Sequence, residues 1–364
     1  RFDLDAISVN YTDMINANLS GKYQINNAIV SHEKDNWKTT TKIQLPETFG
    51  QSIAFSGDLN WSEQDAQIEA WNWQLVTEDV LLGTLLKQTE FSGLTIEDGL
   101  ASLKIKAQGI KYKTSTIEAS VDISRSKLIS VDEKNNNAVL IEQLQGQFSW
   151  QQDDKGWQLS GQDVLLDVND EKWPLTNFNL KRDAAGTLAA ETSYLRLSDL
   201  TAIAVLTKTL PEALRHQKPA GDITSAQLEY DLATNEIKKM SGSLKDFTIL
   251  PWQDVPGVTG LTATVDWNED VVKVDLDSHQ LTLYPEKWLK DAVFFDSFSG
   301  QVHWQRGENW QVTLSELHLW NDDLTLQLDG EIKHDSGENN SDLTIKLDQV
   351  DLKSWQKYVP QTML

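Results

Sequence analysis

The sequence of 364 residues contains no cysteine. Disulfide bonds, cysteine-ligated zinc, iron–sulfur clusters and thiol catalysis are therefore excluded. Long apolar runs are also missing, because the longest helix-like one, Leu200–Lys208, is far shorter than the roughly 20 residues that a membrane helix needs. Nucleophile and nucleotide-binding motifs do not occur, and the histidines form no close metal-binding pair. We therefore expect no enzyme, no cofactor and no metal site.

Positive charge is scarce, since 32 Lys and Arg face 55 Asp and Glu, for a formal net charge of −23. Nucleic-acid binding depends on clustered Lys and Arg, so this balance argues against a nucleic-acid partner. It also argues against electrostatic docking on an anionic lipid surface. The chain starts at Arg1 without Met and stops at Leu364 without a polar tail. We interpret it as a segment of a longer protein, so that any membrane anchor lies outside this chain.

The sequence is instead rich in segments in which apolar and polar residues alternate. Clear examples are Ile117–Ile123, Leu324–Leu328 and Leu343–Leu347. Alternation places the apolar side chains on one face of a strand, and it is typical of antiparallel strands with one solvated face. Polar, glycine-bearing segments such as 152–156 and 306–309 separate the runs and predict tight turns. The sequence therefore predicts a mostly β protein of up-and-down hairpins.

Helix signals are few. The composition predicts a short helix near 78–88, helices near 198–217 and a short closing helix near 353–359. Ser198 is the expected N-cap of the second of these, and Pro211 should interrupt it. The helices are therefore expected as short inserts between hairpins.

Each expected helix begins beside an aspartate that could supply a capping oxygen: Asp79, Asp199 and Asp351. Their spacing is too uneven for a strict solenoid, but it indicates several β-rich units, each opened by a short helix. We predict two segments, 1–193 with the helix near 78–88, and 194–364 with the remaining helices.

A second repeat has the form Gly-x-apolar-x-Trp. It occurs at 57–61, 146–150 and 300–304, and without the glycine at 263–267. Two tryptophan pairs are expected to meet across a hairpin: Trp150 with Trp157 and Trp304 with Trp310. Because these rings share a strand face with Leu, Val and Phe, we interpret them as lining a core or a groove rather than as exposed sugar-stacking platforms.

Several longer motifs occur in a characteristic order. They are Ile141–Trp150, Trp157–Leu159, Trp173–Leu175, Leu195–Leu200, Phe247–Trp252, Val255–Leu261 and Val350–Pro360. With these motifs the chain resembles, over nearly its whole length, the periplasmic part of the YhdP family, which belongs to the AsmA-like superfamily together with TamB. The resemblance implies a segment of an inner-membrane protein of Gram-negative bacteria. It further implies an extended, curved antiparallel sheet whose apolar groove passes phospholipid between the inner and outer membranes, with no catalytic residues.

The alternation is compatible with this AsmA-like β-groove, because one face can line a groove while the other carries the excess acid into water. The expected partners are phospholipid acyl chains, with other envelope proteins as further candidates, and the expected location is the periplasm. The groove candidates are apolar residues of the strands and of the second helix: Leu59, Trp61, Phe148, Trp150, Leu200, Ile203, Leu206, Val265, Trp267, Val302, Trp304, Leu324, Leu326 and Leu328. Leu326→Asp should then impair lipid passage in the full-length protein.

Alternation alone leaves two other interpretations open. The apolar face could be the closed core of a β-sandwich or barrel. In function, the chain could be a tryptophan-rich extracellular carbohydrate-binding or adhesin-like module, since exposed indoles stack on sugar rings. Co-purified phospholipid would favour the conduit, and quenching of tryptophan fluorescence by oligosaccharide would favour the second function.

Overall fold

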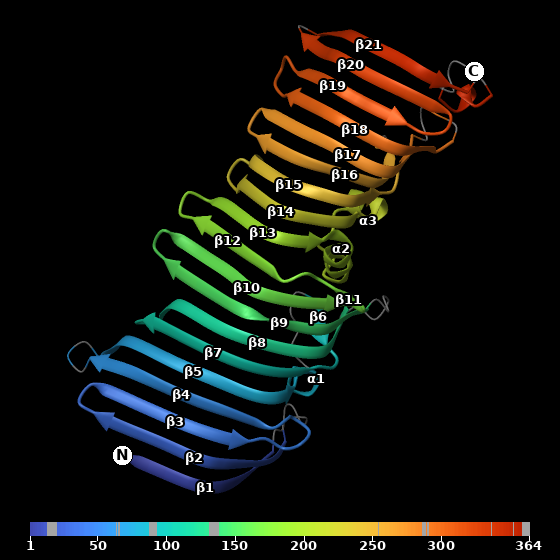
Figure 1. Ribbon diagram of the computed structural model, residues 1–364. Coiled ribbons are helices and arrows are strands. Elements are labelled where there is room, and N and C mark those ends of the chain that lie inside the picture. The colour runs from blue at the N-terminus through green and yellow to red at the C-terminus, as the bar shows by residue number, and fades with distance from the viewer. Residues whose placement is uncertain are drawn as a thin grey trace. The chain divides into compact units, whose positions relative to one another are not determined.

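The structure is a computed structural model that describes residues 1–364 except 13–19, 63, 65, 87–92, 131–137, 254, 286–288, 290, 336, 352 and 359–364. The described residues form 21 strands, three short α-helices and a 3₁₀ turn (Figure 1). They divide into two compact units, Arg1–Ala185 and Gly186–Leu364.

The first unit contains twelve strands and one helix. In chain order these are β1 (Phe2–Tyr11), β2 (Gly21–Glu33), β3 (Asn36–Gln44), β4 (Ser52–Ser62), β5 (Gln67–Leu81), α1 (Leu82–Leu85), β6 (Leu94–Ile96), β7 (Leu100–Ile110), β8 (Lys113–Ser130), β9 (Ala138–Asp153), β10 (Gly156–Val168), β11 (Glu171–Lys172) and β12 (Thr176–Asp183). Each long strand pairs with the next one along the chain. The short strands β6 and β11 pair with β8 and β10, beyond the ends of β7 and β12.

The second unit contains nine strands, two helices and the 3₁₀ turn. They are β13 (Thr187–Arg196), α2 (Leu197–Leu206), α3 (Glu212–Gln217), β14 (Ala220–Asp231), β15 (Glu236–Ile249), β16 (Gly257–Asn268), β17 (Val271–Tyr284), β18 (Val293–Gln305), β19 (Gln311–Trp320), β20 (Leu324–Asp335), β21 (Glu338–Val350) and η2 (Trp355–Tyr358). Sequential strands pair throughout, from β13 to β21.

The sheet is antiparallel and open. Within the described residues β1 pairs only with β2, and β21 pairs only with β20, so neither edge strand closes a barrel. In the part of the chain that the structure describes, strands pack against hydrogen-bonded neighbours in the same sheet rather than against a second sheet. The predicted open antiparallel sheet of repeated hairpins is confirmed, and the sandwich and barrel interpretations are wrong.

The connections at the two ends of the strands differ (Figure 1), and we call the two sides of the sheet along which these ends lie its turn edge and its loop edge. Tight hairpin turns, such as those between β7 and β8 or between β18 and β19, lie along one edge, which we call the turn edge. Longer connections, including α1 in the first unit and α2 and α3 in the second, lie along the opposite edge, which we call the loop edge. Because antiparallel strands reverse at every connection, alternate connections collect on the same side.

Buried apolar clusters lie at the loop edge of each unit. Leu45, Phe49 and Val80 form the first cluster, and Leu281, Val293, Phe295 and Leu324 form the second. These residues belong to strand ends and to the connections that follow them. The clusters of buried side chains are therefore local, whereas most apolar side chains in the middle of the strands are only half-buried.

A bulge of one design recurs in four of the described strands, β5, β10, β15 and β19. The bulged residue Asp79 of β5 has φ of 45°, and its backbone N–H donates to Ser102 Oγ of β7 at 3.1 Å. Equivalent bonds join the N–H of Asp163 to Asn177, of Asp246 to Thr262 and of Glu316 to Asp329. A bulge bends its strand and increases the local twist, so the same bend recurs in both units.

The predicted helices are partly correct. Pro211 lies between α2, which ends at Leu206, and α3, of which it is the N-cap, and it is absent from the helix interior as its fixed φ and missing N–H require. Ser198 is not the N-cap, because α2 already begins at Leu197 and its N-cap is Arg196. Asp199 lies inside the first turn of α2 and is buried, so it is not a cap either.

The other two helix predictions need correction at their starts. Residues 78–81 belong to β5, because the bulge at Asp79 keeps the chain paired with β7, and α1 covers only Leu82–Leu85. At the C-terminal end η2 lies within the predicted range, whose last residue is outside the described part. Asp351 does behave as a turn-forming residue there, since its Oδ1 accepts the Lys353 N–H at 3.0 Å.

Candidate functional site: the apolar face of each sheet

Cross-strand registers build continuous apolar rows on one face of the second unit. Val265 of β16 faces Val274 of β17, which faces Val302 of β18, and all three are half-buried. The next row toward the turn edge is Trp267, Val272 and Trp304. The rows continue through Leu314 and Val312 of β19 to the glycine and isoleucine at positions 330 and 332 of β20. Successive strands thus keep their apolar side chains in line.

The alternate positions of the same strands are polar. One row consists of Thr264, Asp275, Gln301 and Ser315, and another of Asp266, Lys273, His303 and Thr313. The β16, β17 and β18 members of these rows are exposed. A period of two therefore separates an apolar face from a solvated face in this unit, as the alternation predicts.

The first unit repeats this arrangement over more strands. One apolar row runs from β4 to β12 through Gly57, Trp73, Ala107, Ile117, Trp150, Leu159 and Leu180. Its neighbour runs through Phe55, Leu75, Ile105, Ala119, Phe148, Gly161 and Phe178. A surface of this kind can hold an apolar chain by non-directional contact.

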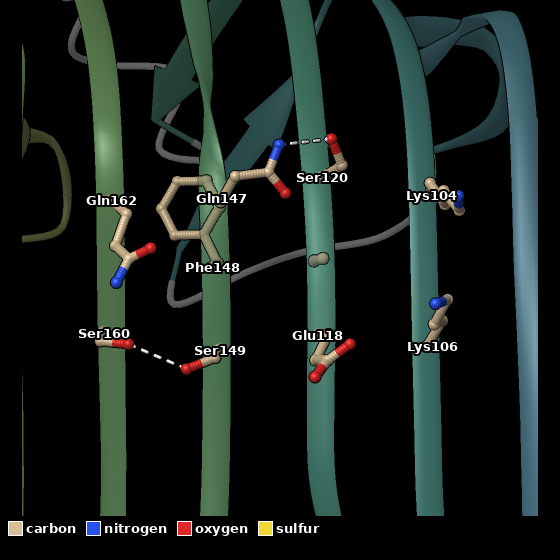
Figure 2. A pocket seen from close by; sticks show the side chains of 10 residues that line it. Lys104, Lys106, Glu118, Ser120, Gln147, Phe148, Ser149, Ser160 and Gln162 are labelled. Carbon is tan, nitrogen blue, oxygen red and sulfur yellow. Dashed lines mark hydrogen bonds between the residues drawn. The ribbon is translucent and has the colours of Figure 1, made fainter.

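The opposite face of the first unit is polar, and a shallow hollow of 560 Å³ crosses it from β7 to β10 (Figure 2). Gln147 donates to Ser120 Oγ at 2.8 Å, and the hydroxyls of Ser149 and Ser160 lie 2.8 Å apart. These bonds between neighbouring strands satisfy polar side chains on the surface of the sheet. The two faces of one strand therefore differ sharply in chemistry.

Glycines allow aromatic rings to lie flat on the apolar face. A Cβ added to Gly109 would lie 2.4 Å from the indole of Trp71, and one added to Gly161 would lie 2.3 Å from the ring of Phe178. Only glycine leaves this space free at the two positions. The rings consequently cover their neighbours' backbone.

An apolar hollow of 590 Å³ opens near the turn edge of the first unit. It is lined mainly by aromatic and aliphatic side chains: Val30, Trp37, Phe55, Leu59, Ile68, Trp71, Trp73 and Tyr112. Phe55 and Trp73 stack with ring centroids 6.4 Å apart. Trp71 Nε1 donates to the carbonyl of Lys111 at 3.0 Å, which anchors the indole to the β7–β8 turn. The volume lies within the ~300–1,000 Å³ range of small-molecule pockets.

Most of the predicted groove residues lie in these rows. Leu59 lines the hollow and Trp61 follows it on the same face of β4, opposite Ile68. The other strand candidates outside β20 also occupy apolar-face rows: Phe148, Trp150, Val265, Trp267, Val302 and Trp304.

The candidates of β20 lie on the apolar face but closer to the loop edge. Leu326 faces Leu319 and Leu347, and Leu328 faces Leu317 and an isoleucine of β21. Leu324 belongs to the buried loop-edge cluster, and Leu326 packs against it. Leu326→Asp would therefore disturb the fold as well as any groove.

The helix candidates are separated from the strand rows. On α2, Leu200 is 38% exposed, Ile203 is half-buried and Leu206 is 3% exposed. The helix connects β13 to β14 at the loop edge and packs against these two strands. The structure does not bring its side chains into the cross-strand rows described above.

Other aromatic contacts were not evident from the sequence. Trp310 stacks on His334 with centroids 5.7 Å apart, rather than on Trp304. Trp37, Trp71 and Trp73 of the hollow lie outside the Gly-x-apolar-x-Trp repeat. Trp71 and Trp73 are two residues apart in β5, and this spacing is the signal in the sequence that could have placed both indoles on one face.

The clearest shift in ionisation lies in a polar cluster between β13 and β14. Tyr194 Oη donates to Asp222 at 2.7 Å, and Arg196 Nε lies 3.4 Å from the same carboxylate. Burial, followed by the hydrogen bond and the charge of Asp222, raises the pKa of Tyr194 to about 12. The cluster ties two strands together. Elsewhere in the described part, no three His, Cys, Asp or Glu side chains meet as a metal site would require.

An open antiparallel sheet with one apolar and one solvated face defines a protein of the β-groove class. The family model described as YhdP protein matches residues 1–364, so the chain belongs to the YhdP family, a family of envelope proteins. Comparisons with curated proteins and with solved structures found no match. Among the described residues, no helix combines the length and apolar character needed to cross a membrane.

Proposed function

We propose that this chain is a segment of a periplasmic lipid conduit, in which the apolar face of each unit carries phospholipid acyl chains between the inner and outer membranes of Gram-negative bacteria. The observation that carries the proposal is the run of apolar rows across successive strands, with no second sheet packed on that face in the described part. Membership of the YhdP family supports it.

The energetics of such a face suit transport. Each methylene that leaves water for the apolar rows contributes ~0.8 kcal/mol, with no directional requirement. A chain can therefore exchange one row for the next without losing a specific bond. The solvated face and the net charge of −23 keep an open sheet soluble.

The proposal assigns the protein no catalytic activity. The partners of this chain would be phospholipid acyl chains, and other envelope proteins would hold the segment in place. Attachment to the membrane would depend on parts outside this chain.

Purification of the 364-residue chain, followed by native mass spectrometry and lipid extraction, tests the proposal. We expect bound phospholipid, and rebinding of a fluorescent acyl-chain phospholipid after delipidation. The carbohydrate-binding alternative predicts that the purified chain carries no phospholipid and binds oligosaccharide instead. A lipid-free chain that binds no lipid probe, but whose tryptophan fluorescence is quenched by oligosaccharide, would refute the conduit.

A further inference from the structure

A cation lies over tryptophan rings at the turn edge of the second unit. The guanidinium carbon of Arg306, in the β18–β19 turn, is 4.7 Å from the centroid of Trp267 and 5.6 Å from that of Trp304. Trp267 Nε1 donates to the carbonyl of Glu269 at 2.9 Å, so its indole is fixed to the neighbouring turn. Cation–π contact of this kind holds the guanidinium against the apolar face.

Arg306 keeps its hydrogen-bonding capacity. The acids of these turns are Glu269, Asp270 and Glu308, yet among the described residues none forms an ion pair with the guanidinium. Its backbone N–H donates to the Asp270 carbonyl, which fixes the turn but leaves the side chain free. The stacked guanidinium therefore still presents N–H donors to an anion.

The charge pattern of this face favours an anion. Toward the turn edge, the apolar-face positions of the described strands β14 to β20 carry aromatic, aliphatic and histidine side chains and no carboxylate. The acids of these strands, such as Asp266 and Asp275, lie on the opposite face. Although the net charge of the chain is −23, the apolar face beside Arg306 therefore carries no acid in these described strands.

The first unit has a related arrangement. Lys111 of the β7–β8 turn lines the apolar hollow, and Trp71 is bonded to its carbonyl. Arg182 faces Trp157 across β10 and β12, near the turn edge of the same apolar face. A cation beside a tryptophan therefore recurs at turn edges of both units.

We propose that Arg306, stacked on Trp267 and Trp304, binds the phosphate of a phospholipid whose acyl chains lie on the apolar rows beneath. This inference rests on the proposed function and adds the position of the headgroup. The headgroup lies at the turn edge, and the chains extend along the strands, across successive rows, from Trp267 toward Val265. A guanidinium binds phosphate through charge-assisted hydrogen bonds, while the indoles suit the boundary between apolar and aqueous surroundings.

Binding of two probes with identical acyl chains, phosphatidylglycerol and diacylglycerol, to the 364-residue chain tests the inference. We expect the unaltered chain to bind the phospholipid more tightly. Arg306→Gln should weaken phosphatidylglycerol binding by about 3–10-fold and leave diacylglycerol binding unchanged, because an exposed charge-assisted bond is of modest strength. Arg306→Lys should retain part of the preference, since it keeps the charge. Lys273→Gln, an exposed cation on the opposite face, is the matched control and should change neither affinity.

The outcomes separate the two proposals. Binding of both probes with a preference that Arg306→Gln leaves intact would overturn the headgroup site while the conduit stands. If Arg306→Gln weakens the binding of both probes equally, the arginine stabilises the apolar face and does not bind the phosphate. This outcome also overturns the headgroup site. If the unaltered chain binds neither probe, the conduit itself is refuted, and the headgroup site with it.

Discussion

Val302 offers the sharpest test of the apolar face. Its side chain lies between Val274 and Leu314 in the middle of a row, away from the loop-edge cluster. The next residue, His303, lies on the solvated face of the same strand and is exposed. Val302→Asp and His303→Asp therefore add the same carboxylate one residue apart, on opposite faces.

The expected loss of affinity follows from the contacts. We assume that an acyl chain places about three methylenes against Val302. Replacement of the valine by a hydrated carboxylate removes the apolar contact of these methylenes, which lowers the binding free energy of the chain by about 2 kcal/mol at ~0.8 kcal/mol per methylene. This corresponds to about 30-fold weaker binding. The fold should lose only about 1 kcal/mol, because Val302 is half-buried and its full burial contributes ~1.5–3 kcal/mol.

The assay is equilibrium binding of a fluorescent acyl-chain phospholipid, with denaturant unfolding as the check on stability. We expect His303→Asp to bind within about twofold of the unaltered chain. If Val302→Asp remains folded and binds lipid as His303→Asp does, the apolar row is not the lipid path. Should Val302→Asp fail to fold, Val302→Thr has nearly the same shape and should still weaken binding by about threefold.

The remaining predictions concern the fold. Gly109→Ala should lower the free energy of unfolding by about 1–3 kcal/mol, because its Cβ would collide with the Lys113 carbonyl at 2.3 Å and with Trp71; unchanged denaturant midpoints would contradict this. Asn321→Ala should cost about 1–3 kcal/mol, since the buried amide accepts the N–H of Leu324 at 2.8 Å, and an unaltered thermal midpoint would oppose that expectation. Tyr194, whose folded pKa of about 12 exceeds the ordinary 10.0, contributes stability that is present below pH 10 and lost as the pH rises toward 12. Asp222→Asn should lower that pKa but leave it above 10.0, since burial is the larger cause; tyrosinate titration against Tyr194→Phe checks this, and an unmoved pKa would exclude a role for Asp222.

Local patterns in the sequence predicted much of the fold. Alternation in segments such as Leu324–Leu328 identified strands, because a period of two leaves one face apolar whatever the partner strand. Pro211 marked the break between two helices, since its ring is incompatible with a helix interior. Alternation alone could not distinguish an open sheet from a closed core, because both require the same alternation. The resemblance to the YhdP family predicted the open sheet, and the structure confirms it.

Features that depend on register were missed. Residues 78–81 were predicted to begin a helix, but the bulge at Asp79 and the bond to Ser102 keep them in β5. Trp304 and Trp310 were expected to meet, yet the register places Trp310 on His334 and leaves Trp304 under Arg306. Such contacts depend on where a neighbouring strand begins, which its own sequence does not state.

The sequence by itself determined that this protein is a set of two-faced antiparallel hairpins without cysteine and with excess acid on the solvated side. Those properties follow from residue type and spacing along one strand. Only the tertiary structure decided that the apolar faces remain uncovered by a second sheet in the described part, that the buried apolar clusters lie at the loop edge, and that Trp267, Trp304 and Arg306 come together. The physical reason is that pairing register and bulges align side chains from different strands, and this alignment is a property of neighbours rather than of any single segment.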